Sequence, residues 1–278
     1  MDTRFWGPSG WRLLHLITAA VEDLPVNHIH TFFVNLPYAL PCKFCRASLS
    51  DYIQNDPVPH QKSEYAQWLY RIHNRVNAKL RDQHLNQTPD PRWSDVKRRY
   101  NELYKAPCTQ NTFLGWDFLY STAYTTPCPA VVSAPMPNAP PALTIPTPEL
   151  RNRWGVMSRS ERIPLLEAWW NALEHVLPYK SWRTAWASGP KRPHTRNGRA
   201  PLTRWLFKIE AHMCKTLNAE KHHENYQAVC SELSTFSSNC GKLSKKLKVK
   251  TCRAKKSTAR TTLKRRRHSI HQQTGGFL

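Results

Sequence analysis

Apolar residues recur every three or four positions through the first third of the chain, which is the spacing of amphipathic helices. Trp11, Leu14 and Thr18 share one side of the first such segment, and Ser9 has the residue type of an N-cap. Pro41 has the residue type favoured at a first helical position, directly ahead of Cys42. We therefore expect a compact unit in residues 5–104, with helices over residues 10–21, 27–40, 41–53, 63–80 and, shorter than the others, 93–104.

The pattern changes after residue 105. Eight of the 22 residues from 127 to 148 are proline, so we expect residues 106–150 to form an extended linker. Helical spacing returns in residues 151–238, mainly over 160–186 and 202–217. The fold class that we predict is all-α: a four-helix bundle plus a short fifth helix in residues 1–105, a second, smaller helical domain in residues 151–238, and a disordered basic tail in residues 239–278.

Charge adds a candidate partner. The chain has 41 Lys and Arg against 19 Asp and Glu, and residues 239–278 carry thirteen of these cations and no acidic residue. Such a tail favours binding to nucleic acid or to an acidic protein. One alternative function is therefore non-specific binding of nucleic-acid phosphates by residues 242–267. The sequence has no secretory signal and no apolar stretch of about 18 residues, so we expect no transmembrane segment and a location on the cytosolic side of membranes.

Eight cysteines in such a protein are more often reactive or metal-binding than a disulfide framework. Cys42 and Cys45 are three residues apart at a predicted helix start, where two thiols can form a disulfide and the helix N-terminus stabilises a thiolate. The same spacing occurs in half of a zinc site, which two of His28, His30 and His60 would complete. By itself the spacing leaves a redox pair, a zinc site and coincidence open.

The predicted helix over residues 63–80 places polar residues on its apolar side, because His73, Val76, Asn77 and Leu80 share one face. Buried polar groups need partners. His73 is either a core histidine bonded to neighbouring backbone or part of a site for a large, flat, polar-edged cofactor inside the bundle.

Together, Trp11-x-x-x-His15, Cys42-x-x-Cys45 and His73-Asn74-x-Val76-Asn77-x-x-Leu80 resemble the Erv/ALR family of FAD-linked sulfhydryl oxidases, over about residues 5–104. The resemblance implies a helical bundle that holds FAD, a homodimer, and a thiol oxidase that makes disulfides in substrate proteins. It implies that Cys42, at the exposed helix end, exchanges with the incoming thiol. Cys45 would lie against the isoalloxazine ring and pass electrons to FAD, and molecular oxygen would accept them as H2O2.

The resemblance also assigns cofactor-binding positions. Trp11 and His15 match positions that contact the flavin or adenine, His73, Asn74 and Asn77 match the FAD-binding helix, and Lys79 and Arg81 would be phosphate neighbours. The full set that we predict to bind FAD is Gly7, Trp11, His15, His73, Asn74, Val76, Asn77, Lys79, Leu80 and Trp93, with no metal ligand.

The sequence departs from cellular relatives in its other cysteines. Residues 81–107 contain none, so the further disulfide that many relatives carry there is absent. Cys108 and Cys128 are candidate shuttle cysteines, with Cys230 and Cys240 as the second choice, although ordinary free thiols or a structural disulfide would show the same spacing. A minimal module with added helices and a basic tail resembles the oxidases of large cytoplasmic DNA viruses, which implies a role in virion assembly in the host cytoplasm and a place in the virion.

Overall fold

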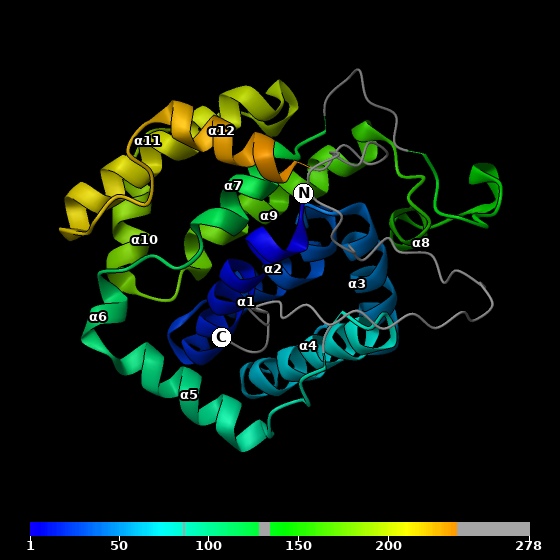
Figure 1. Ribbon diagram of the computed structural model, residues 1–278, viewed down its shortest axis with the longest axis horizontal. Coiled ribbons are helices and arrows are strands. Elements are labelled where there is room, and N and C mark those ends of the chain that lie inside the picture. Colours follow the sequence, from blue (N-terminus) through cyan, green and yellow to red (C-terminus); the bar gives the residue numbers. More distant parts are fainter. Residues whose placement is uncertain (86, 128–133, 238–278) are drawn as a thin grey trace, which may run out of the picture.

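The structure, a computed structural model, describes residues 1–85, 87–127 and 134–237. These residues fold into helices joined by loops, without a β-strand, which confirms the predicted all-α class. Figure 1 shows the arrangement. The α-helices are α1 (Thr3–Ala19), α2 (Val26–Ala39), α3 (Lys43–Asn55), α4 (Tyr65–Asp82), α5 (Trp93–Lys105), α6 (Pro107–Gln110), α7 (Trp116–Tyr124), α8 (Pro148–Arg153), α9 (Arg159–Val176), α10 (Lys180–Ala187), α11 (Arg199–Leu217) and α12 (Tyr226–Phe236). Short 3-10 turns lie at Val21–Asp23, Lys62–Glu64, Ala142–Thr144 and Thr195–Asn197.

Three helix starts differ by two residues or more from the sequence prediction. Helix α4 begins at Tyr65, two residues later than expected, because Lys62–Glu64 form a 3-10 turn. Helix α1 begins at Thr3, because the carboxylate of Asp2 accepts a hydrogen bond from the backbone N–H of Arg4 at 2.9 Å and caps the helix. Ser9 therefore lies inside α1, where its hydroxyl donates to the backbone oxygen of Leu114 at 2.9 Å. Helix α3 begins at Lys43, with Cys42 rather than Pro41 at the boundary, so Cys42 is the N-cap residue.

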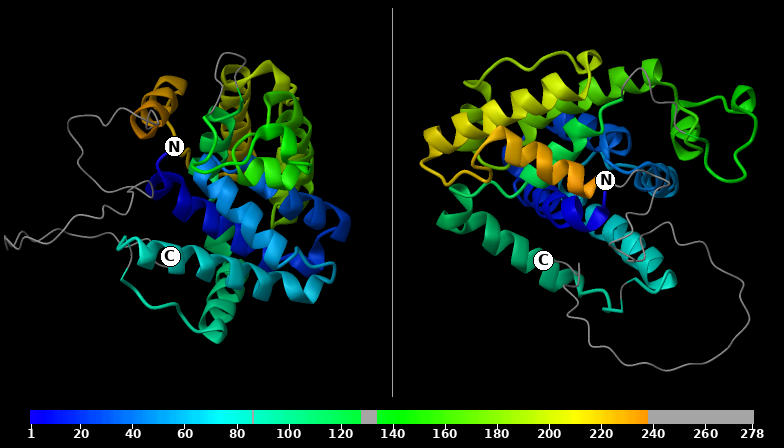
Figure 2. Two further views of the ribbon diagram at one scale, coloured as in Figure 1. Left: turned by 90° about the vertical axis from the view of Figure 1, so that its right-hand side faces the viewer. Right: turned by 45° about the horizontal axis from the view of Figure 1, so that its top comes forward.

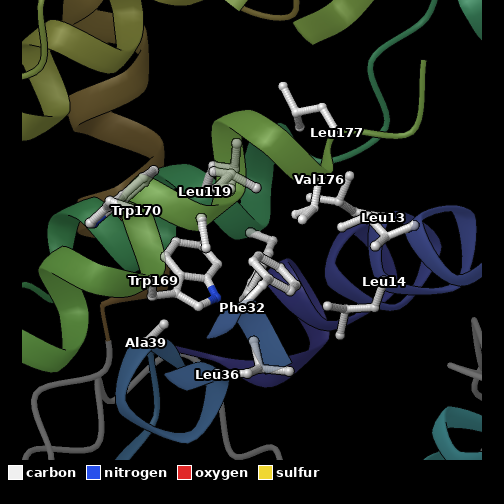
Figure 3. Close-up of a cluster of buried hydrophobic side chains, with 14 of the residues drawn as sticks. Leu13, Leu14, Phe32, Leu36, Ala39, Leu119, Trp169, Trp170, Val176 and Leu177 are labelled. Atoms are coloured by element: carbon white, nitrogen blue, oxygen red, sulfur yellow. The ribbon is translucent and has the colours of Figure 1, made fainter. Parts of the chain in front are cut away.

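The first and second halves of the chain share one hydrophobic core. Helix α9 packs along α2, and α7 packs against α1 and α11. In Figure 3, Trp169 of α9 lies beside Phe32 of α2, and their ring centroids are 5.3 Å apart. The cluster of buried apolar residues continues into α10, α11 and α12. The described residues of the expected second domain, 151–237, are helical as expected, but they pack onto the helices of the first domain and share its core.

The expected linker is wrong for residues 116–124, which form α7 in the centre of this core. Phe118 is fully buried, and Trp116 and Tyr120 are nearly so. The physical reason lies in the composition: the prolines are concentrated in residues 127–148, whereas residues 113–124 are rich in aromatic and apolar side chains that gain from burial.

Helices α4 and α5 lie on the opposite side of α1 from α9 and α11, as Figure 2 shows. There, Leu16 of α1 forms a smaller apolar cluster with Val96 and Tyr100 of α5. None of the helices in the described parts of the chain combines the length and the apolar character that a membrane span requires. The basic tail, residues 239–278, lies outside the described residues.

Candidate redox and cofactor site

The cysteine pair lies where α2 leads into α3. Cys42 is the N-cap residue of α3 and Cys45 lies in its first turn, close to the backbone N–H groups that a helix leaves without internal partners. The expectation that Cys42 is the exposed member is wrong: Cys42 is only 7% exposed, and Cys45 is partly exposed. Cys42 is part of the shared hydrophobic core, which the sequence pattern of α3 alone could not reveal.

One cation, Arg46, is close enough to both cysteines to interact with them electrostatically. Arg46, the residue after Cys45, donates from Nη1 to the backbone oxygen of Leu40 at 3.0 Å. Burial lowers the pKa of Arg46, and the negative charge that Cys42 and Cys45 can carry acts in the opposite direction. A positive charge close to a thiol favours the thiolate, so the surroundings suit a reactive dithiol. Sequence reasoning missed Arg46, although its position directly after the second cysteine was the available signal.

A second group of site residues joins α1, α4 and α5. The rings of Trp11 and His73 are stacked, with centroids 3.6 Å apart and planes 9° apart. His15 Nε2 and His73 Nδ1 are 3.1 Å apart, and Tyr100 stacks on His15 at 4.5 Å. The structure thus brings Trp11, His15 and His73 together and adds Tyr100, whose helical spacing from Val96 was the only sign in the sequence.

Both histidines are neutral near pH 7. Burial lowers the pKa of His15 to about 3, and burial together with the neighbouring His15 lowers the pKa of His73 well below its usual range. In the hydrogen bond between them, one ring nitrogen donates and the other accepts. His73 is therefore bonded to another side chain, and the two rings offer neutral hydrogen-bonding edges.

The polar residues of α4 differ in their hydrogen-bond partners. Asn77 donates from Nδ2 to Asp90 at 3.0 Å, and Asp90 pairs with Arg81 at 2.7 Å. Lys79 donates from Nζ to the hydroxyl of Ser48 at 2.6 Å, which ties α4 to the cysteine helix α3. Asn74 Oδ1 is buried and accepts no hydrogen bond within the described structure.

The remaining predicted positions lie around this group. Val76 and Leu80 are partly buried on α4, and Trp93 lies against Tyr70, with ring centroids 5.4 Å apart. Gly7, in the first part of α1, has open space where a side chain would begin.

The residues present suit a flat ligand with polar edges. Aromatic rings for stacking, neutral imidazole edges and the unpaired Asn74 oxygen lie on neighbouring turns of α1 and α4, and Lys79 and Arg81 provide cations one to two turns further along. This combination of apolar faces, few polar groups and nearby cations is what a cofactor with an aromatic ring system and phosphates requires.

The geometry does not support the zinc alternative. His30 stacks on His60 at 4.6 Å, and His28 lies 4.0 Å from His175, measured between ring centroids. Among the residues that the structure describes, no group of three or more His, Cys, Asp or Glu side chains is placed to hold a metal ion.

Two of the candidate shuttle cysteines, Cys108 and Cys230, lie within the described residues. Cys108 is exposed on α6, which lies on the opposite side of the molecule from α3 in Figure 1. Cys230 is partly exposed on α12, and Cys128 and Cys240 lie outside the described residues.

These features define the class of protein: an all-helical protein whose N-terminal part combines a dithiol pair at a helix start with a stacked Trp–His site. Residues 8–101 match the model of the Erv1 / Alr family, so this part of the chain is similar to that family. The match covers about a third of the chain and includes both cysteines, Trp11, His15 and the whole of α4. Residues 102–278 lie outside it.

Curated relatives are also similar to only part of this chain. An FAD-linked sulfhydryl oxidase of African swine fever virus (isolate Pig/Kenya/KEN-50/1950) is 29% identical over 102 residues, which cover 35% of this chain and 81% of the relative. The mitochondrial FAD-linked sulfhydryl oxidase ERV1 of Saccharomyces cerevisiae is 31% identical over 29% of this chain and 45% of the relative. A probable FAD-linked sulfhydryl oxidase, R368, of Acanthamoeba polyphaga mimivirus is 28% identical over 28% of this chain and 59% of its own length. No solved structure matches the chain.

Proposed function

We propose that this protein is an FAD-dependent thiol oxidase that forms disulfides in substrate proteins. The observation that carries the proposal is the joint presence, within the region matched by the Erv1 / Alr family, of a dithiol pair with a cation close by and a stacked Trp–His site. Relatives over this region carry the name FAD-linked sulfhydryl oxidase, and the residues fit that chemistry.

The Cys42–Cys45 pair exchanges its disulfide with substrate thiols. A substrate thiolate attacks one sulfur of the pair, forms a mixed disulfide and releases the other cysteine as a thiolate. A second substrate thiolate attacks the substrate sulfur of this mixed disulfide and releases the remaining cysteine. The substrate leaves as a disulfide, and the pair keeps two electrons. The helix N-terminus and Arg46 stabilise the thiolates that leave in both steps.

The roles of the two cysteines stay predictions: Cys42 exchanges with substrate and Cys45 faces the flavin. Because Cys42 is buried, a protein thiol reaches it only when the segments that cover it move. The segment at Ala134 lies next to the pair, where its backbone oxygen accepts a hydrogen bond from the ammonium group of Lys43 at 2.8 Å.

When bound, FAD would supply a two-electron acceptor for the reduced pair, with molecular oxygen as the final acceptor and H2O2 as the product. Trp11 and His73 offer the apolar faces that stack on a ring, and His15 and Asn74 offer hydrogen-bonding edges. Asn77, Lys79 and Arg81 lie further along α4, where the cations suit phosphates. Gly7, Val76, Leu80 and Trp93 complete the predicted set.

The first experiment is the visible spectrum of the purified protein, before and after a dithiol is added in air. We expect flavin bands near ~450 nm that bleach with dithiol and recover with oxygen. Cys45→Ser should keep the bands and lose the bleaching, whereas Cys214→Ser, which changes a buried cysteine on α11 that is no shuttle candidate, should behave like the parent. A colourless protein, or bleaching that survives Cys45→Ser, would overturn the proposal.

Finer parts of the proposal rest on relatives and on sequence. Since several relatives come from viruses, we propose a role in the oxidation of virion proteins in the host cytoplasm at assembly sites, with the protein carried in the virion. We also propose a homodimer, and contact of the basic tail with nucleic acid or an acidic protein. Sedimentation of the full chain and of a chain that ends at residue 238, each with and without DNA, tests the last two points.

A further inference from the structure

One helix in the second half of the chain carries exposed positive charge without exposed negative charge. Residues 191–217, which include the whole of α11, contain seven Lys and Arg but a single acidic residue, Glu210. Glu210 is fully buried, where it accepts hydrogen bonds from the hydroxyl of Tyr120 at 2.5 Å and from the backbone N–H of His223 at 2.8 Å. The Lys, Arg, Asp and Glu side chains on the surface of this segment are therefore all positively charged.

Six of the seven cations are exposed and take part in no ion pair within the described residues. These six are Lys191, Arg196, Arg199, Arg204, Lys208 and Lys215. The seventh, Arg192, pairs with Glu167. Helix α5 shows the more usual surface, on which both signs of charge are mixed and Arg98 pairs with Asp95 at 3.0 Å.

Three of the exposed cations lie along one line of α11. Arg204, Lys208 and Lys215 follow one another at four and seven residues, so they project from the same side of the helix. At 1.5 Å per residue this row is about 16 Å long, and each strand of a DNA duplex carries one phosphate per about 3.4 Å of axis, so the row spans about five phosphates. The loop before α11 stays beside the helix, because the indole of Trp205 donates to the backbone oxygen of Pro190 at 2.8 Å.

Two of the arginines are held by aromatic rings and not by acids. The guanidinium of Arg204 lies over the ring of Tyr226 from α12, 5.4 Å from its centroid. The guanidinium of Arg199 lies over the ring of Tyr124 from α7, at 5.0 Å. Such a contact restricts the side chain but does not neutralise its charge, so the guanidinium can still bind an external anion.

Acidic groups on the neighbouring elements do not neutralise these cations. Asp117 of α7 and Glu232 of α12 each bond to a histidine, at 2.6 and 2.8 Å. Two exposed acids, Glu220 and Glu224, lie in the loop after the C-terminal end of α11 and form no ion pair in the part of the chain that the structure describes. The positive charge of α11 therefore has no counterpart within the described fold.

We propose that the six exposed cations on and before α11, which we call the α11 surface, bind the phosphate backbone of nucleic acid. Phosphate contacts need a row of cations and no apolar anchor, whereas a protein partner needs an apolar centre. The exposed large apolar residues of the described chain lie on other elements: Val26, Val34 and Leu143. The inference is independent of the oxidase function, and it places binding on a folded helix in addition to the basic tail.

The α11 surface is separate from the redox site. In Figure 1, α11 lies at the edge of the molecule, on the opposite side from the cysteine helix α3. It also lies outside residues 8–101, the part of the chain that matches the family. Nucleic acid bound at α11 therefore leaves the helix that carries the cysteines uncovered.

The test measures binding of the full chain to a duplex DNA of about 30 base pairs, by fluorescence anisotropy over a range of NaCl concentrations. One variant removes three charges from α11: Arg204→Gln, Lys208→Gln and Lys215→Gln. The matched control removes three exposed charges from α5: Lys97→Gln, Arg98→Gln and Lys105→Gln. Both variants keep the basic tail and lose the same net charge, so they differ only in where the charge is removed.

Each phosphate contact contributes about 0.9 to the slope of log K against log salt concentration. We therefore expect the α11 variant to reduce the magnitude of this slope by about 2–3, and the α5 variant to keep the slope of the parent. A conservative variant that exchanges Lys and Arg at the three α11 positions should also keep it, because the charge is retained. If the triple Gln variant does not fold, Lys208→Gln alone should reduce the slope by about 1.

A folded α11 variant with the slope of the parent would refute the proposal. An equal reduction in the α5 variant would refute it as well, because binding would then depend on net charge and not on this surface. Loss of binding to phosphatidylserine vesicles in the α11 variant, with an unchanged DNA slope, would assign the surface to a membrane instead.

Discussion

Replacement of Trp169 by alanine tests whether the two halves of the chain form one folding unit. Trp169 is fully buried and lies between Phe32 of α2, at 5.3 Å, and Phe118 of α7, at 5.9 Å, measured between ring centroids. A buried Trp removes about 200 Å² from water, which at about 25 cal/mol per Å² stabilises the fold by about 5 kcal/mol. Measured Trp→Ala changes in cores cost about 3–5 kcal/mol, and we expect Trp169→Ala to fall in that range.

Trp169→Phe is the matched variant. The indole Nε1 of Trp169 is buried without a hydrogen-bond partner, so phenylalanine removes an unpaired donor while it loses only part of the ring. We expect a cost of less than about 2 kcal/mol. Leu143→Ala is the control for a substitution on the protein surface, because Leu143 is fully exposed. This substitution should change the free energy of unfolding by less than about 0.5 kcal/mol.

Urea unfolding gives the free energies, and hydrogen exchange shows where they act. If the core is shared, Trp169→Ala speeds exchange in α2 and α4 as well as in α9, since all of them open with the same unit. Exchange that speeds up in α9 to α12 while α2 and α4 stay as protected as in the parent would refute the reasoning and restore two separate domains.

Three further predictions follow from the polar contacts. Although burial lowers the pKa of His223, hydrogen bonds with Glu210 and Glu232 raise it above its usual value. The stability that protonated His223 contributes is therefore complete below about pH 6.5 and is lost as the pH rises through the folded pKa. The difference in Tm between the parent and His223→Gln should shrink towards high pH. Although burial raises the pKa of Glu167, hydrogen bonds from Arg192 and Thr195 lower it to about 2; Glu167→Gln should therefore cost about 1–3 kcal/mol in urea unfolding at pH 7, and this difference should disappear as the pH falls from 4.5 towards 2. Asn152 is buried and donates to the hydroxyl of Ser50 at 2.8 Å, which holds α8 on α3; Asn152→Ala should cost about 1–2 kcal/mol and raise the iodoacetamide labelling rate of Cys42, and an unchanged rate would mean that α8 does not protect the pair.

Helices were predictable where local pattern and packing agree. The apolar spacing of residues 27–40 and 93–104 gave α2 and α5 to within one residue at each end, because one face of each helix is buried and the other is not. The boundaries of α1 and α3 were less accurate, since a cap depends on which side chain meets the backbone, and both Asp2 and Ser9 are suitable residue types.

Long-range packing was not predictable from local pattern. A dense run of prolines in residues 127–148 suggested a linker from residue 106 onwards, but the aromatic residues of α7 are buried in contacts with α1 and α11, which lie about a hundred residues away along the chain in either direction. The burial of Cys42 was missed for the same reason, because the side chains that cover a helix start come from elsewhere in the chain.

The cofactor residues were named by resemblance, and the geometry explains why three of them belong together. Trp11, His15 and His73 are 58 to 62 residues apart across α1 and α4, yet their rings stack and bond because both helices pack side by side. Tyr100 completes this stack from α5 and has no motif of its own. A motif marks residues whose type is constrained by chemistry, whereas Tyr100 is placed by packing, which only the folded chain reveals.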